Sequence, residues 1–71
     1  KTSKTINPIK KARIIHELSQ FELSQELGVS QGTIGHWEHG RAVPTFSNAK
    51  KLKKFFDERG YNLSVDEIFC L

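Results

Sequence analysis

Residues 18–40 read LSQFELSQELGVSQGTIGHWEHG, and their serines and glycines indicate two helices joined by a very short turn. Ser19 followed three residues later by Glu22 is a capping-box pattern, in which each side chain accepts a hydrogen bond from the other residue's backbone N–H. Gly28 suits the left-handed conformation that ends a helix, and Ser30 suits the N-cap of the next one. Two helices joined this closely must cross at a steep angle.

The second helix of this pair is expected over residues 31–39, with Gly40 ending it, and it has two unlike sides. Ile34, Trp37 and Glu38 share one side at helical spacing. The opposite side carries small and polar residues: Gly32, Gly35, His36 and His39, flanked by Gln31 and Thr33. We therefore expect Ile34 and Trp37 to be buried and the polar side to be uncovered.

Helix signals also precede this pair. Asn7 followed by Pro8 is typical of a helix start, because Asn caps well and Pro lacks an N–H where none is needed. This helix is expected to run to about Glu17, and its predicted apolar side comprises Ile9, Ile14, Ile15 and Leu18. Residues 1–6 show no periodicity and are predicted to form a flexible arm.

Further helix signals follow the pair. Thr45 is the expected N-cap of a helix that reaches about Glu58 or Arg59, with Gly60 ending it. Its predicted apolar stripe comprises Phe46, Ala49, Leu52, Phe55 and Phe56. Ser64 and Glu67 repeat the capping-box pattern before a short helix that contains Val65, Ile68 and Phe69. The sequence thus predicts an all-α fold of five short helices, with one domain over residues 7–71.

Composition limits the kind of protein. A chain of 71 residues leaves little room for a deep catalytic cavity, and no apolar run approaches the about 20 residues of a membrane-spanning helix. The lone cysteine, Cys70, excludes an internal disulfide framework and fits a reducing compartment.

The charge is unevenly distributed. Up to Phe56 the chain has ten basic and four acidic residues, whereas from Asp57 onward it has one basic and four acidic residues. A basic body with an acidic end suits a polyanionic partner, although a solvated surface explains the same pattern.

Residues 18–40 closely resemble the helix-turn-helix of the lambda-repressor and Cro-like (XRE-type) family, and the flanking pattern extends the resemblance to about residues 8–69. The matching features are LSQ, LGVSQ, the Thr33–Ile34 pair, and Trp37–Glu38 followed by Gly40. The resemblance implies a lambda-repressor-like fold and binding to double-stranded DNA, whose major groove accommodates a helix that reads base edges.

The resemblance also implies roles by position. The implied base contacts are Gln31, Gly32, Thr33 and His36, and the implied contacts to the DNA backbone are Ser19, Gln20, Ser30, His39, Arg41 and Lys4 of the arm. Gln31 suits a bidentate pair with adenine, and His36 suits guanine or a phosphate. Arg13 and Glu38 match positions that form a structural salt bridge.

The chain departs from the family pattern at Gly32, where relatives often carry a base-reading side chain, and at Gly35, a second glycine in the same helix. Each glycine costs about 1 kcal/mol of helix stability relative to Ala. A functional explanation, either close approach of the backbone to DNA or loss of a contact, and drift at exposed positions explain these glycines about equally well. The segment between Phe56 and Ser64 is longer than in the family pattern, so the sequence does not indicate which surface forms the dimer.

Other polar residues have simpler explanations. His36, His39 and the distant Cys70 do not supply the four ligands of a structural zinc site, so we expect no metal and no cofactor. His16 is expected on the surface of the first helix. Lysines 50, 51, 53 and 54 surround their helix, and most should be solvated while one or two reach phosphates.

The sequence therefore predicts a sequence-specific transcriptional repressor that binds a palindromic operator as a homodimer. Its expected location is the cytoplasm of a bacterial or phage-infected cell, in association with the nucleoid. One alternative is a DNA-binding antitoxin with a toxin partner at its apolar C-terminal end, formed by Ile68, Phe69 and Leu71. Another is a protein-interaction module on the same fold, which only Gly32 and Gly35 support. No nucleophile–base pair, phosphate loop or paired carboxylates favours an enzyme.

Overall fold

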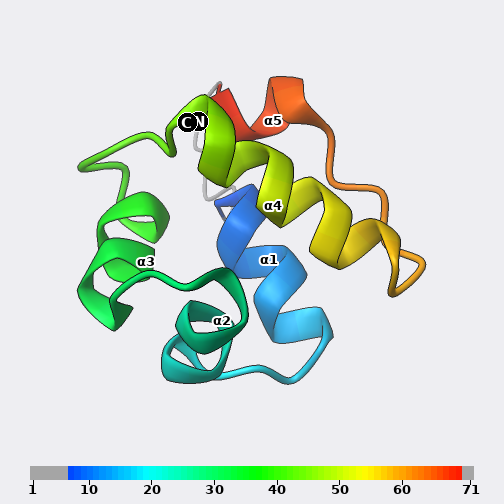
Figure 1. Ribbon diagram of the computed structural model, residues 1–71, viewed down its shortest axis with the longest axis horizontal. Helices are drawn as coiled ribbons and strands as arrows, with labels where there is room; N and C mark the ends of the chain where they lie inside the picture. Colours follow the sequence, from blue (N-terminus) through cyan, green and yellow to red (C-terminus); the bar gives the residue numbers. More distant parts are fainter. Residues whose placement is uncertain (1–6, 70–71) are drawn as a thin grey trace, which may run out of the picture.

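The computed structural model describes residues 7–69 and shows five helices (Figure 1). They are α1 (Pro8–Ile15), α2 (Gln20–Leu27), α3 (Gln31–Glu38), α4 (Phe46–Asp57) and α5 (Val65–Phe69). No residue in the described range belongs to a strand, so the predicted all-α fold is confirmed. Each helix begins at the residue that follows its predicted N-cap.

Local hydrogen bonds explain these boundaries. Ser19 Oγ accepts from the Glu22 N–H at 2.9 Å, and the Ser19 N–H donates to Glu22 Oε1 at 2.8 Å, which completes the predicted capping box. The same reciprocal pair joins Ser64 and Glu67 before α5. Gly28 ends α2 with a φ of 72°, a left-handed conformation that glycine adopts without a Cβ clash.

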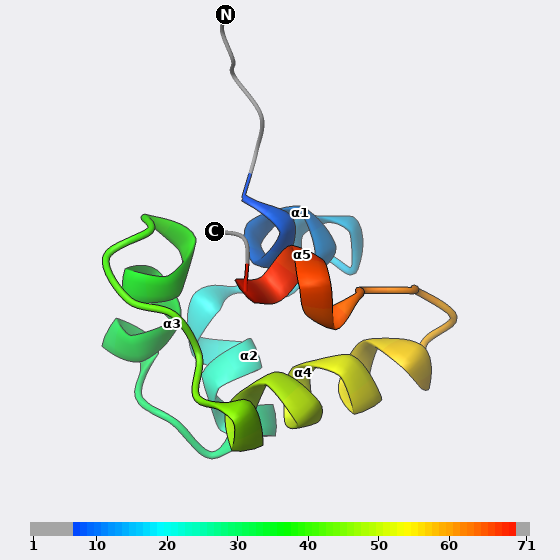
Figure 2. The same ribbon diagram turned by 90° about the horizontal axis from the view of Figure 1, so that it is seen from above.

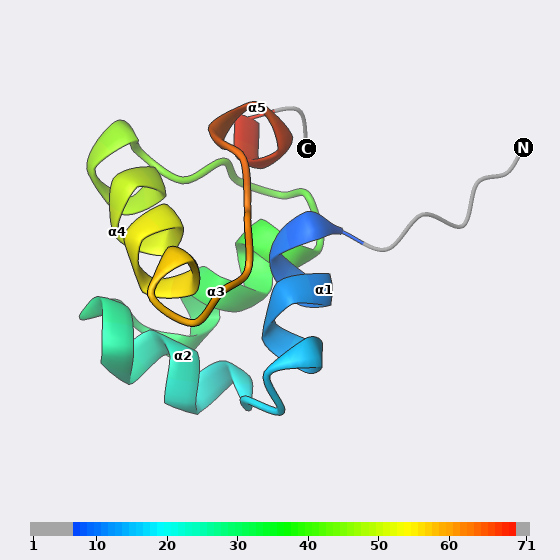
Figure 3. The same cartoon turned by 90° about the vertical axis from the view of Figure 1, so that its right-hand side faces the viewer.

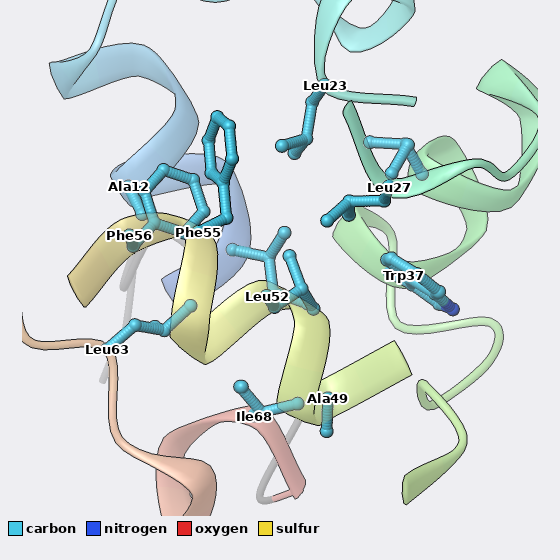
Figure 4. Close-up of a cluster of buried hydrophobic side chains, with 12 residues drawn as sticks. Ala12, Leu23, Leu27, Trp37, Ala49, Leu52, Phe55, Phe56, Leu63 and Ile68 are labelled. Carbon is cyan, nitrogen blue, oxygen red and sulfur yellow. The ribbon is translucent and has the colours of Figure 1, made fainter. Parts of the chain in front are cut away.

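The helices enclose one hydrophobic core. α1 and α4 lie on opposite sides of it, while α2 and α5 close it at opposite ends (Figure 3). α3 lies at one end of the molecule and the loop between α4 and α5 at the other (Figures 1 and 2). Much of this core is drawn in Figure 4, and its buried members are Ile9, Ala12, Leu23, Leu27, Ile34, Trp37, Ala49, Leu52, Phe55, Phe56, Leu63 and Ile68.

The apolar side predicted for α1 is wrong. Ile9 is fully buried, but Ala12 makes the next core contact, whereas Ile14 and Ile15 are 49% and 52% exposed. Side chains three or four residues apart share a helix face, so Ile9 and Ala12 point into the core together. The helix also ends two residues earlier than expected, and Glu17 then takes a φ of 56° in the turn toward α2.

Two other apolar residues lie differently from the prediction. Phe46, assigned to the buried stripe of α4, is 67% exposed, and Lys50 Nζ lies 5.4 Å from its ring centroid. Ile68, assigned to a partner surface at the C-terminal end, is fully buried in the core. Of the other residues named for that surface, Phe69 is exposed and Leu71 lies outside the described residues.

The segment between α4 and α5 contributes to the core. Leu63 is fully buried, although no periodic pattern marks it in the sequence. The ring of His16 lies 5.2 Å from that of Phe56 and 5.7 Å from that of Tyr61. His16 is therefore half-buried in an aromatic cluster, and its predicted place on the surface is wrong.

Candidate nucleic-acid interface

α3 has one buried side and one uncovered polar side. Ile34 and Trp37 are 0% and 3% exposed and anchor the helix to the core. Gln31, Gly32 and His36 are exposed. The structure thus places three of the four residues expected to contact bases on the uncovered side of one helix.

The fourth of these residues, Thr33, takes part in capping α3. It is half-buried, and its hydroxyl lies 2.8 Å from Ser30 Oγ. Ser30 Oγ also accepts from the Thr33 N–H at 3.1 Å. The hydroxyl of Thr33 is thus engaged with Ser30, whereas its methyl group takes no part in capping. The backbone N–H groups that begin α3 carry a partial positive charge, which favours a nearby anion.

A buried ion pair fixes the end of α3 to α1. Arg13 Nε donates to Glu38 Oε2 at 2.6 Å, and Arg13 Nη2 donates to Glu38 Oε1 at 3.0 Å. Arg13 Nη1 reaches the Leu18 carbonyl at 2.8 Å. The Arg13 and Glu38 side chains are 13% and 1% exposed. Because both charges are removed from water, each depends on the other for compensation.

Two further side chains tie α3 to its neighbours. Gln20 Nε2 donates to Glu38 Oε1 at 3.1 Å, and Asn7 Nδ2 donates to the Trp37 carbonyl at 3.0 Å, while Asn7 Oδ1 caps α1. The sequence predicts that Asn7 caps a helix and that Gln20 contacts DNA. It does not predict that either side chain also bonds to α3. No local pattern signals these links, since the partners lie 30 and 18 residues away.

The residues expected to contact the DNA backbone lie at helix ends. They are Ser19 and Gln20 at the start of α2, Ser30 before α3, and His39 and Arg41 after α3. All are exposed except Gln20, which is half-buried. His39 Nδ1 lies 2.8 Å from the Gly35 carbonyl, which places the ring proton on Nδ1 because a carbonyl only accepts. Lys4 lies outside the described residues.

The lysines of α4 differ in their surroundings. Lys53 pairs with Asp57 at 3.3 Å, and Lys51 Nζ donates to the Leu27 carbonyl at 3.4 Å, at the end of α2. Lys54 is exposed. Whether any of them reaches a phosphate stays a prediction.

Residues 7–69 contain no group of three or more His, Cys, Asp or Glu side chains arranged to hold a metal ion. Within the same range, every helix is too short or too polar to cross a membrane.

Comparison with known proteins agrees with this geometry. A helix-turn-helix family profile matches residues 9–61. The chain belongs to the helix-turn-helix family. A protein of Methanocaldococcus jannaschii that is described as an uncharacterized HTH-type transcriptional regulator is 36% identical over 63 residues, which cover 89% of this chain and 88% of that relative. No solved structure matches the chain.

Membership in the helix-turn-helix family makes the protein a DNA-binding transcription regulator. The two helices of the motif correspond to α2 and α3, with Gly28 in the turn between them. This family is generally non-enzymatic.

Proposed function

We propose that this helix-turn-helix protein binds a palindromic operator as a homodimer and represses transcription in the cytoplasm. The uncovered polar side of α3 carries the proposal, because Gln31, Gly32 and His36 lie on it while Ile34 and Trp37 hold the helix in the core. A helix held in this way fits the major groove, where each base pair presents a distinct pattern of donors and acceptors.

The proposed base contacts follow from the chemistry of α3. Gln31, the first residue of the helix, donates to and accepts from one adenine through its amide. His36 lies more than one turn later and reaches guanine or a phosphate. Thr33 offers its methyl group to a thymine methyl, and Gly32 lets the helix backbone approach the base edges.

The proposed backbone contacts surround this helix. Gln20 and the hydroxyls of Ser19 and Ser30 bind phosphates on one side. On the other side, beyond α3, Arg41 supplies a full positive charge. His39 donates to a phosphate through Nε2 when its ring is doubly protonated, since Nδ1 is engaged with the Gly35 carbonyl. Lys4 belongs to the arm proposed for residues 1–6. These contacts fix orientation and supply affinity without reading sequence.

Dimerisation is proposed because one α3 reads only a half-site. Two recognition helices related by a two-fold axis lie about 34 Å apart, so each reads one half of a palindrome on the same side of the duplex. A dimer bound across a promoter excludes polymerase, which is the proposed route to repression.

Selection from a random pool of double-stranded DNA tests this function. We expect an enriched palindrome, with affinity that falls steeply as the salt concentration rises because phosphate contacts release counterions. A Gln31→Ala/His36→Ala variant serves as the control and should lose the enrichment while keeping most of the salt dependence, which the other phosphate contacts supply. Absence of enrichment, together with weak binding that is insensitive to salt, contradicts the proposal.

A further inference from the structure

The side-chain amide of the half-buried Gln20 lies close to α3 at two points. On one side, Nε2 donates to Glu38 Oε1 at 3.1 Å. On another, a Cβ atom placed on Gly35 would lie 3.8 Å from Gln20 Oε1 and 3.9 Å from Nε2. The amide of an α2 residue therefore lies directly over the backbone of α3, where glycine leaves the helix surface bare.

Glu38 is a fixed acceptor for this amide. Arg13 donates two hydrogen bonds to its carboxylate, whose side chain is 1% exposed. An ionised carboxylate only accepts, so the amide must turn its nitrogen toward Glu38. The second N–H of Gln20 and its Oε1 have no partner among the protein groups of residues 7–69, so that N–H is available to an external acceptor.

We infer that Gly35 and Glu38 are positioning residues that hold the Gln20 amide with its unused N–H preset to donate to a DNA phosphate. The inference rests on the proposed function. A free glutamine loses rotational freedom when it binds, whereas an amide already held in place avoids most of that loss. This role also explains why position 35 lacks a larger side chain. The backbone there is not left-handed, and the atoms within 4 Å of an added Cβ belong to Gln20.

Two substitutions at position 35 test whether the size of the side chain there decides where the Gln20 amide lies. In Gly35→Ala, the new Cβ makes an ordinary contact with the amide, and we expect native DNA affinity. In Gly35→Ile, the preceding helical turn disfavours a carbon at one of the three staggered positions around Cα–Cβ, so the two further carbons fill both positions that point away from the helix, where the Gln20 amide lies. We expect the isoleucine to displace the amide.

A double-mutant cycle measures whether position 35 acts through Gln20. We expect Gln20→Ala to weaken binding to the selected site and to a random duplex by about tenfold each, the loss of a hydrogen bond to a charged group. Gly35→Ile should cause the same loss, and the double variant should lose no more. Native affinity in Gly35→Ile, or losses that add in the double variant, overturn the inference, because the isoleucine then acts elsewhere or not at all.

NMR of the free protein tests the amide placement without DNA. In the native protein and in Gly35→Ala, the two Gln20 side-chain N–H resonances should be well separated and exchange slowly with water, whereas in Gly35→Ile they should move to the positions of a free glutamine. Resonances already at those positions in the native protein overturn the inference. If native affinity survives Gln20→Ala, the phosphate contact is wrong while DNA binding stands. If the native protein binds no DNA, the proposed function is wrong.

Discussion

Gln31 is the residue on which sequence recognition depends most in the proposed complex. It is exposed at the start of α3, and Gln31→Ala removes both atoms that an amide offers to adenine. We expect a loss of about 1–3 kcal/mol of discrimination at one base pair, with the other positions unchanged. Titration against single base-pair variants of the selected site measures this. Gln25→Ala, an exposed glutamine of α2, is the matched control, and a uniform weakening across all variants would show that Gln31 does not read a base.

Arg41 contributes charge rather than recognition. It is exposed just beyond α3, and Arg41→Ala should weaken binding to specific and random DNA alike. The slope of log affinity against log salt concentration should fall by about one, because one phosphate is no longer neutralised. Titrations at several salt concentrations test both parts. A loss confined to one base position, or an unchanged slope, contradicts this role.

Arg13 contributes stability because it is buried with its partner. Arg13→Ala leaves the Glu38 carboxylate, which is 1% exposed, without its counter-ion, and we expect the free energy of unfolding to fall by about 3 kcal/mol. Lys53→Ala breaks an exposed ion pair and should cost about 0.5 kcal/mol or less. Urea denaturation compares the two variants. Similar losses in both would mean that burial does not set the strength of the Arg13–Glu38 pair.

Glycines within a helix and at its end differ in their physical role. Gly32 is helical, and the nearest atom to a Cβ there is Ser30 Oγ at 3.9 Å, so Gly32→Ala should raise the free energy of unfolding by about 0.5–1 kcal/mol. Gly28 has a φ of 72°, and Gly28→Ala should lower it by about 1 kcal/mol. Thermal unfolding measures both changes. If the backbone approaches the bases at Gly32, Gly32→Ala should also weaken DNA binding. Unchanged affinity would show that DNA binding does not require glycine at this position.

The helices themselves were largely predictable because their ends are locally encoded. The caps at Asn7, Ser19, Ser30 and Thr45 act through hydrogen bonds to residues two or three positions away, so the sequence displays both partners. The left-handed end of α2 needs only Gly28. Local chemistry of this kind places an element without any knowledge of the tertiary fold.

Burial was less predictable because it depends on distant partners. The three isoleucines of α1 have the same intrinsic preference, yet Ile9 is buried while Ile14 and Ile15 are exposed. Leu63 occupies a core position from a loop, where no periodicity marks it. In the candidate interface, the polar side of α3 followed from helical spacing, but the bond from Gln20 to Glu38 arises only when α2 and α3 cross.

The dimensions of the whole molecule set the scale of the DNA site. The described part measures 34 × 25 × 24 Å, and α3 has eight residues and a length of about 12 Å, enough for one half-site. In the proposed dimer, the two recognition helices must lie about 34 Å apart, one turn of B-DNA, for both to enter the major groove on the same side of the duplex. The proposed palindrome should therefore have half-site centres about 10 base pairs apart.

A dimer of fixed geometry makes this spacing testable. Five base pairs inserted between the half-sites turn one of them by about half a helical turn, to the opposite side of the duplex. A rigid dimer then engages only one half-site, so we expect the affinity to fall to that of a duplex with a single half-site. Fluorescence anisotropy at one fixed salt concentration measures this, and substitution of central base pairs without a change of length is the control. If the lengthened site binds as tightly as the selected one, the two copies bind independently, and the operator is read by monomers.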